Sequence, residues 1–178
     1  ENISYSYKNS KNGDIVKVFE NFSLEIKNGT SAVIMGASGC GKTTLLKLIC
    51  GLFEPDEGEI LFNNRKVSEI KAKDRNIAYV SEGVNNYPHL SGFRNIAFPL
   101  SIEKVDSKEI RERVFDAARK AKIDKFLQFK PKQLSLGQNQ RIAIARALVK
   151  KPDLYVFDEM LASIDEATSL ELMRDLKS

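Results

Sequence analysis

The chain has 178 residues, with 28 basic and 24 acidic side chains and a formal net charge of +4. That length fits one domain, and 42% hydrophobic with 29% charged residues is an ordinary globular balance, which excludes disorder, collagen-like repeats and a disulfide scaffold. Cys40 and Cys50, without a second pair, favour a reducing compartment, and no apolar run reaches the ~18 residues of a membrane span. The slight basic excess is only weak support for a nucleic-acid partner.

Short apolar runs between turn residues predict strands in the first third of the chain, at residues 3–7, 16–19, 22–26 and 59–62. The run 31–35 is apolar without alternation, which predicts a strand buried on both faces. A helix is expected over residues 43–50, and Gly51 is placed to end it.

The rest of the chain alternates strand and helix patterns. Buried-type strands are expected at residues 77–80 and 154–157, and helices at 107–122 and 137–149. Residues 81–107 are expected to be rich in loops. Strands that alternate with helices predict an α/β domain with a largely parallel sheet.

A glycine-rich segment, residues 36–43 (Gly-Ala-Ser-Gly-Cys-Gly-Lys-Thr), fits the pattern G-x-x-x-x-G-K-[ST]. It lies between the predicted strand that ends at Met35 and the predicted helix that follows. Its backbone N–H groups would point at phosphate oxygens, Lys42 would reach the β- and γ-phosphates, and the Thr43 hydroxyl would coordinate Mg²⁺. The alternative, a plain strand–turn–helix with chance glycines, is disfavoured by this context.

Two acidic residues, Asp158 and Glu159, follow the predicted strand 154–157 directly. A carboxylate at the end of a buried strand suits a metal ion, so Asp158 would hold Mg²⁺ or its water. Glu159 could act as a general base on the attacking water. Alone, the pair would be interpreted as a strand ending in solvated acids, but beside a phosphate loop the catalytic interpretation is preferred.

A third segment, Leu-Ser-Leu-Gly-Gln at residues 134–138, opens the predicted helix 137–149. A hydroxyl, free N–H groups and a helix dipole suit a second phosphate contact. Taken alone, this segment is a plain helix cap.

Together the three segments resemble the nucleotide-binding domain of ATP-binding cassette (ABC) transporters, from about Tyr5 to the C-terminus. Residues 36–43 resemble that family's Walker A loop, residues 134–138 its signature and residues 154–159 its Walker B strand. The resemblance implies an α/β P-loop NTPase (RecA-like) fold with a mostly parallel sheet core. It also implies one domain over residues 1–178, with residues 1–30 in an antiparallel β subdomain and residues 82–135 in an inserted helical subdomain.

The resemblance also implies which residues form the site. Those expected to bind nucleotide are Tyr7, Gly36, Ala37, Ser38, Gly39, Cys40, Gly41, Lys42, Thr43 and Thr44. Tyr7 would stack on adenine, with Tyr5 as its competitor, or be a strand-face aromatic that packs on the sheet. The catalytic residue would be Glu159, and the metal ligands Thr43, Asp158 and, as an additional candidate, Glu82. Ser135, Gly137 and Gln138 would contact the γ-phosphate that a partner domain binds at its own Lys42, and Asp165 would be the D-loop aspartate.

The implied function is that of the ATP-binding, ATP-hydrolysing subunit of a transporter, with ATP and Mg²⁺ as cofactors. Residues 87–90 and 130–135 look most like the sugar-importer ATPases. Two domains would pair head to tail around ATP, residues 81–107 would face transmembrane permease subunits, and the protein would lie on the cytoplasmic face of the membrane without nucleic acid. The alternatives are an ATP-binding domain with little or no hydrolysis and a soluble, non-transport ABC ATPase.

Several positions depart from the family's pattern. Glu82 stands for a glutamine, Leu136 for the signature's first glycine and Met160 for a proline. The expected switch histidine is absent, and the sole histidine, His89, is expected to be a surface loop residue. We therefore expect a chain truncated at its C-terminus or a domain unable to complete the usual hydrolytic site.

Overall fold

The computed structural model describes residues 1–8, 13–67, 69–81, 83 and 85–159. Contacts divide the chain into two compact units, with the boundary between Asn76 and Ile77. Each unit is described by itself.

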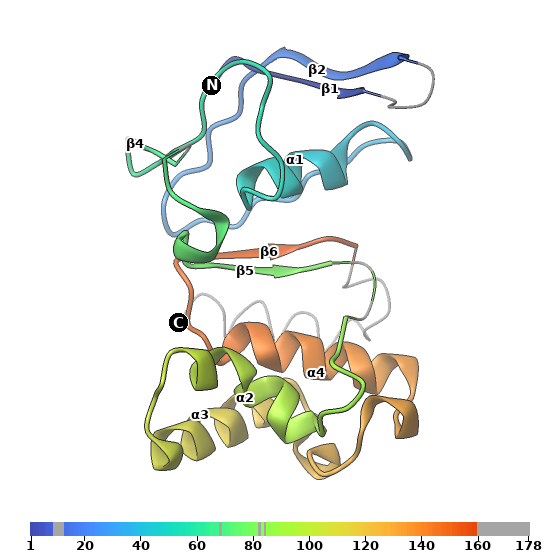
Figure 1. Cartoon of the computed structure of the whole chain (residues 1–178), viewed down its shortest axis with the longest axis vertical. Coiled ribbons are helices and arrows are strands. Elements are labelled where there is room, and N and C mark those ends of the chain that lie inside the picture. Colours follow the sequence, from blue (N-terminus) through green and yellow to red (C-terminus); the bar gives the residue numbers. More distant parts are fainter. Residues whose placement is uncertain (9–12, 68, 82, 84, 160–178) are drawn as a thin grey trace. The chain divides into compact units, whose positions relative to one another are not determined.

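The first unit begins with a hairpin. Strand β1 (Ile3–Lys8) pairs antiparallel with β2 (Ile15–Phe22) (Figure 1). In this register Tyr7 lies opposite Val16. The first predicted strand is confirmed, but β2 is one strand that ends at Phe22, so the separate strand predicted at 22–26 is wrong. Residues 23–27 have no regular structure, because in the described chain they join no ladder that would hold them as a strand.

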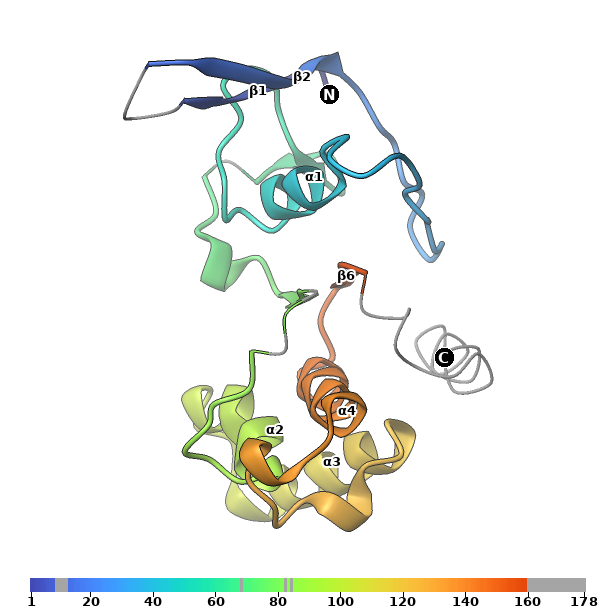
Figure 2. The ribbon, with the colours of Figure 1, turned by 90° about the vertical axis from the view of Figure 1, so that its right-hand side faces the viewer.

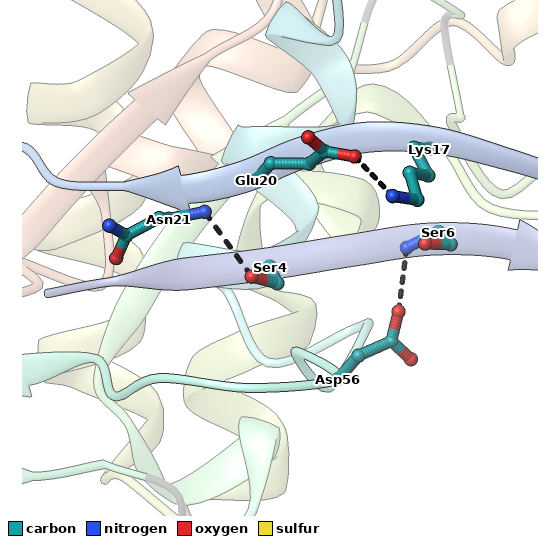
Figure 3. A network of polar contacts seen from close by, with 6 residues as sticks. All are labelled: Ser4, Ser6, Lys17, Glu20, Asn21 and Asp56. Atoms are coloured by element: carbon teal, nitrogen blue, oxygen red, sulfur yellow. Dashed lines mark hydrogen bonds and ion pairs between the residues drawn. The ribbon is translucent and has the colours of Figure 1, made fainter.

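The hairpin is tied to the turn at residues 54–58, as Figure 3 shows. The Ser6 N–H donates to Asp56 Oδ2 at 2.8 Å, and the Asp56 N–H donates to the Ser4 carbonyl at 2.9 Å. The Asn21 N–H donates to Ser4 Oγ at 3.2 Å, which links β2 to β1 outside their ladder. Gly58 has a positive φ of 86°, and a Cβ there would lie 2.3 Å from the Asn2 carbonyl oxygen, so only glycine fits this approach.

A second, very short hairpin follows, in which β3 (Leu61–Phe62) pairs with β4 (Arg65–Lys66). Asn63 and Asn64 make the turn with φ of 51° and 61°, as a type I′ turn requires. The strand predicted at 59–62 is confirmed over its second half.

The apolar run 31–35 is not a strand, so the prediction of a strand buried on both faces is wrong for this structure. Val33 and Met35 are 76% and 85% exposed. An apolar run becomes a buried strand only when neighbours accept its backbone hydrogen bonds, and no described strand pairs with this one.

Helix α1 (Lys42–Ile49) confirms the predicted helix of the first unit. It buries Thr44, Leu45 and Leu48, and the chain leaves it through Gly51 at a φ of 71°. The helix C-terminus is capped from a distance, because Arg75 Nη1 donates to the Ile49 carbonyl at 3.2 Å. A short 3₁₀ helix, η1 (Ala72–Asp74), directly precedes that arginine.

The second unit is built on a parallel strand pair. Strand β5 (Ile77–Val80) pairs in parallel with β6 (Leu154–Phe157), in the register Ile77 to Leu154 and Val80 to Phe157. Both predicted strands are confirmed, and their parallel direction is that of the predicted sheet. Figures 1 and 2 show the helices of this unit on one side of the pair. Ala78 and Val80 face those helices and belong to their core.

The helices are α2 (Gly92–Ile102), α3 (Ser107–Lys120) and α4 (Leu136–Leu148), with the 3₁₀ helices η2 (Asp124–Phe126) and η3 (Pro131–Gln133) between the last two. The bounds of α3 and α4 confirm the predicted helices. The core residues between them include Ile96, Leu100, Val114, Ile142 and Ile144. No helix in the described part of the chain is long and apolar enough to cross a membrane.

Helix α2 lies inside the segment expected to be rich in loops, and the sequence analysis did not predict this helix. Pro99 stands within the helix, where proline normally breaks the pattern. The helix nevertheless forms because Ser91 caps it and its apolar side is buried in the core. Asn95 is fully buried on the same helix, and its amide donates to the carbonyls of Tyr87 and Leu90, each at 3.1 Å.

Candidate functional site

The glycine-rich loop of the first unit leads directly into α1. Gly39 and Gly41 adopt φ of 80° and 99°, and Gly41 occupies the N-cap of α1 with no side-chain hydrogen bond. A Cβ on Gly41 would lie 2.6 Å from Val18 Cγ1, so neither the backbone nor the space admits a side chain there. The first N–H groups of a helix have no partner within it, so this uncapped end can receive an anion.

Lys42 folds back over the same loop. Its Nζ donates to the carbonyls of Gly36 and Ala37, each at 3.0 Å. The Cys40 N–H closes the loop by donating to the Ala37 carbonyl at 3.3 Å. The ammonium group is therefore held at the glycine-rich loop by carbonyl acceptors, which phosphate oxygens could replace.

The two N-terminal tyrosines have different surroundings. The Tyr5 ring stacks on Phe53 with centroids 5.6 Å apart, and burial, followed by the charges of Tyr7 and Asp56, raises the pKa of Tyr5. Tyr7 is 41% exposed, and its ring meets the rings of Tyr5 and Phe53 edge-on. Its hydroxyl shares a 2.9 Å hydrogen bond with Thr44 Oγ1 in the first turn of α1. Tyr7 is thus the more available ring, and it is tied to the helix that carries the phosphate loop.

The two acidic residues of the second unit, Asp158 and Glu159, differ in burial and in backbone conformation. Asp158 is 4% exposed, and its N–H extends the β5–β6 ladder by donating to the Val80 carbonyl at 2.9 Å. Its Oδ2 accepts a hydrogen bond from the Tyr79 hydroxyl at 3.0 Å. Glu159 is exposed, with a left-handed backbone at φ 53°. Sequence reasoning missed Tyr79, because the register that brings β5 beside β6 joins residues far apart in the chain and leaves no local signal.

The segment 134–138 forms the start of α4 as a capping box. Ser135 Oγ accepts from the Gln138 N–H at 3.3 Å, and Gln138 Oε1 accepts from the Ser135 N–H at 2.8 Å. A Cβ on Gly137 would meet open space, and Leu136 is 68% exposed. This segment therefore forms the helix cap that the sequence analysis gave as the alternative to a phosphate contact. The surface beside the cap, at Leu136 and Gly137, is open.

Two asparagines that the sequence did not single out support this cap. Asn139 Nδ2 donates to the carbonyls of Pro131, Leu134 and Ser135 at 2.9, 3.2 and 3.1 Å. Asn86 Nδ2 in turn donates to the Asn139 carbonyl at 2.8 Å. The loop after β5 is therefore bonded to the start of α4 within the second unit.

The predicted site residues fall in different parts of the structure. Tyr7 and residues 36–44 lie in the first unit, while Ser135, Asp158 and Glu159 lie in the second. Glu82, Met160 and Asp165 lie outside the described residues. His89 is an exposed loop residue with its ring 6.3 Å from that of Tyr87, as expected.

A glycine-built loop at the open end of a helix, with a lysine folded over it, defines a phosphate-binding domain of the P-loop class. The chain belongs to the ABC transporter family, which matches residues 19–162. The family resemblance inferred from the motifs is confirmed.

Two curated relatives are similar to this chain over nearly all of its length. The chain is 41% identical over 161 residues to the spermidine/putrescine import ATP-binding protein of Pasteurella multocida, a match that covers 90% of this chain and 44% of that protein. It is 40% identical over 174 residues to the osmoprotective compounds uptake ATP-binding protein of Synechocystis, covering 98% and 48%. The chain thus spans less than half the length of these relatives.

Solved structures agree on the fold. The dimeric structure of a bacterial ABC transporter cassette matches with a TM-score of 0.88 and 33% identity, covering 98% of this chain and 78% of that one. A dimeric post-hydrolysis state of an ATP-binding cassette, bound to ADP and Pi, matches with a TM-score of 0.90 and 32% identity, covering 100% and 82%. The predicted P-loop NTPase fold class is confirmed.

Proposed function

We propose that this chain is the ATP-binding and ATP-hydrolysing domain of an ABC importer subunit. The observation that carries the proposal is the phosphate loop, with Gly39 and Gly41 in left-handed conformations and Lys42 over the opening of α1. The relatives named above, which are import and uptake ATP-binding proteins, support the direction of transport. The whole of residues 1–178 would form one nucleotide-binding domain, with residues 1–30 in its β subdomain and residues 82–135 in its helical subdomain.

Within the site, residues 36–44 would hold the phosphates through backbone N–H groups, Lys42 and the first turn of α1. Tyr7 would stack on the adenine, because it is an exposed residue whose ring meets Phe53 only edge-on, whereas Tyr5 is partly buried and stacks face to face on Phe53. The Tyr7–Thr44 hydrogen bond supports this role, since it joins the stacking ring to the phosphate-binding helix.

Mg²⁺ is the metal that this activity implies, and a hydroxyl and a carboxylate are oxygen donors of the kind it takes. Thr43 stands in the first turn of α1 and Asp158 is a buried carboxylate at the carboxyl end of β6. Mg²⁺ is held in such sites by one or two carboxylates, with phosphates and waters completing the shell. In the parts of the chain that the structure covers, no group of three or more His, Cys, Asp and Glu residues could hold an ion alone, which suits a metal that arrives with ATP. When bound, it would neutralise charge on the phosphates, and Glu82 is a further candidate ligand.

Hydrolysis would use Glu159 as the general base on water. Ser135, Gly137 and Gln138 would contact the γ-phosphate held by a second ABC nucleotide-binding domain, in a homodimer or a heterodimer, and Asp165 would act at the same interface. The dimeric cassettes among the solved structures support such a pairing. The further partners would be transmembrane permease subunits, with this domain on the cytoplasmic face of the membrane.

The test is ATP binding by calorimetry. We expect Lys42→Ala to abolish binding, because it removes the only side-chain cation in the 36–43 loop. The matched control is Lys47→Ala, which removes an ammonium group from the same helix, where it lies 5.2 Å from the Phe53 ring. Normal binding by Lys42→Ala would overturn the proposal.

Turnover is tested separately by phosphate release. Glu159→Gln keeps the shape of the side chain but cannot accept a proton, so we expect ATP to bind and turnover to fall by about 100-fold or more. An unsubstituted chain that binds ATP but releases no phosphate would instead favour the non-hydrolysing alternative.

A further inference from the structure

The Tyr79–Asp158 contact joins two neighbouring strands at the acidic end of the second unit. In the parallel register Tyr79 lies beside Val156, two residues before Asp158, so these side chains share one face of the β5–β6 pair. On the opposite face Tyr155 packs against the helical core. The hydroxyl of Tyr79 reaches Oδ2 of a carboxylate that is nearly removed from solvent.

We infer that Tyr79 is a positioning residue that orients the Asp158 carboxylate toward the metal of Mg·ATP. The inference rests on the proposed function. It assigns Tyr79 no contact with nucleotide, because its effect is exerted through the carboxylate it bonds.

The Tyr79 hydroxyl constrains the orientation of this carboxylate. The backbone of Asp158 is fixed by its N–H bond to Val80, but the terminal torsion of an aspartate is broad and close to two-fold. A hydrogen bond to Oδ2 selects one orientation of the plane, and a carboxylate has lone pairs enough to accept this bond and still face a metal or its water. Mg²⁺ demands near-ideal octahedral geometry, so the plane of the carboxylate matters.

The size of the effect follows from similar arrangements. Groups that hydrogen-bond to metal ligands typically change metal affinity by about 10–100-fold when they are removed. Tyr79→Phe removes the hydroxyl and keeps the ring, which is partly buried. We therefore expect an effect near the lower limit, about tenfold, since Asp158 itself stays in place.

The experiment measures Mn²⁺ affinity by electron paramagnetic resonance on the chain saturated with ATP, and ATP binding without metal by calorimetry. We expect Tyr79→Phe to weaken Mn²⁺ binding about tenfold and to leave metal-free ATP binding unchanged. The control is Tyr155→Phe, which removes a hydroxyl from the neighbouring strand on the opposite face and should change neither quantity.

A second measurement asks whether Tyr79 acts through Asp158. In an Asp158→Asn background the metal ligand is already lost, so adding Tyr79→Phe should not weaken Mn²⁺ binding further. Thermal unfolding of each variant separates loss of folding from loss of metal affinity.

The inference is overturned if Tyr79→Phe binds Mn²⁺ as tightly as the unsubstituted chain, or if Tyr155→Phe weakens Mn²⁺ binding equally. An additive effect in the Asp158→Asn background would also overturn it. Failure of the proposed function has a different signature, since the unsubstituted chain would then bind no ATP, or bind it without Lys42.

Discussion

The phosphate loop of the first unit and the acidic end of the second are built in opposite ways. The loop is made by backbone, from left-handed glycines and the open end of α1, within one short stretch of sequence. The acidic end is made by tertiary contact, since Asp158 is held by Val80 and Tyr79, which are 78 and 79 residues away. We therefore expect the loop to be disrupted most by substitutions of its glycines. The acidic end should be disrupted most by substitutions that remove a buried hydrogen-bond partner.

The largest expected effect is therefore in the loop. Gly41→Ala forces a side chain into a left-handed backbone and against Val18, so we expect about 2–5 kcal/mol of destabilisation and loss of ATP binding. Gly39→Ala is the control, because its φ is also positive but a Cβ meets nothing within 4 Å. It should cost about 1–2 kcal/mol in urea unfolding. Equal losses for both variants would contradict a role for the Val18 contact.

The second prediction concerns a buried hydrogen-bond partner in the second unit. Asn95→Ala leaves the Tyr87 N–H and several carbonyls without their buried partner, for which we expect a loss of about 2–4 kcal/mol. Chemical unfolding measures it. Metal-free ATP binding by the loop of the first unit should be unaffected at temperatures where the variant is folded. Loss of ATP binding in the folded variant would contradict the expectation that the loop of the first unit binds ATP independently of Asn95.

A smaller effect is expected at the start of α4. Ser135→Ala removes the side chain that caps the helix, which should cost about 1 kcal/mol in thermal unfolding. ATP binding by the single domain should be retained, because Ser135 is proposed to act on the nucleotide of a partner domain. ATPase activity that is unchanged at saturating protein would contradict that role.

The smallest effect has the opposite sign. Gly137→Ala lies in the first turn of α4, where a Cβ meets open space, so we expect stability to rise by up to about 1 kcal/mol. ATPase activity should nevertheless fall, because the open surface is proposed to receive a phosphate. A Gly137→Ala variant that is more stable and also fully active would contradict the proposed phosphate contact of Gly137.

The sequence predicted best what depends on neighbours in the chain. The loop 36–43 and the strands 77–80 and 154–157 lie where they were expected, because turn chemistry and continuous apolar runs are local signals. Helix α2 was missed, because Pro99 interrupts the pattern while tertiary burial of Ile96 and Leu100 keeps the helix intact.

Contacts between distant residues could not be predicted in this way. The Tyr79–Asp158 bond depends on the register of two strands far apart in sequence, which no local pattern encodes. The run 31–35 was predicted to be a buried strand from its apolar composition alone. It pairs with no strand in the described part of the chain, and composition does not reveal whether a pairing partner exists.

The backbone of Glu159 shows what the position proposed for the general base costs the fold. A left-handed φ of 53° is strained for glutamate by about 1–2 kcal/mol, whereas glycine would adopt it freely. Selection for stability alone would favour glycine immediately after Asp158. The chain instead keeps a carboxylate there, so a Glu159→Gly variant should be the more stable protein and, by the role proposed for that carboxylate, the less active one.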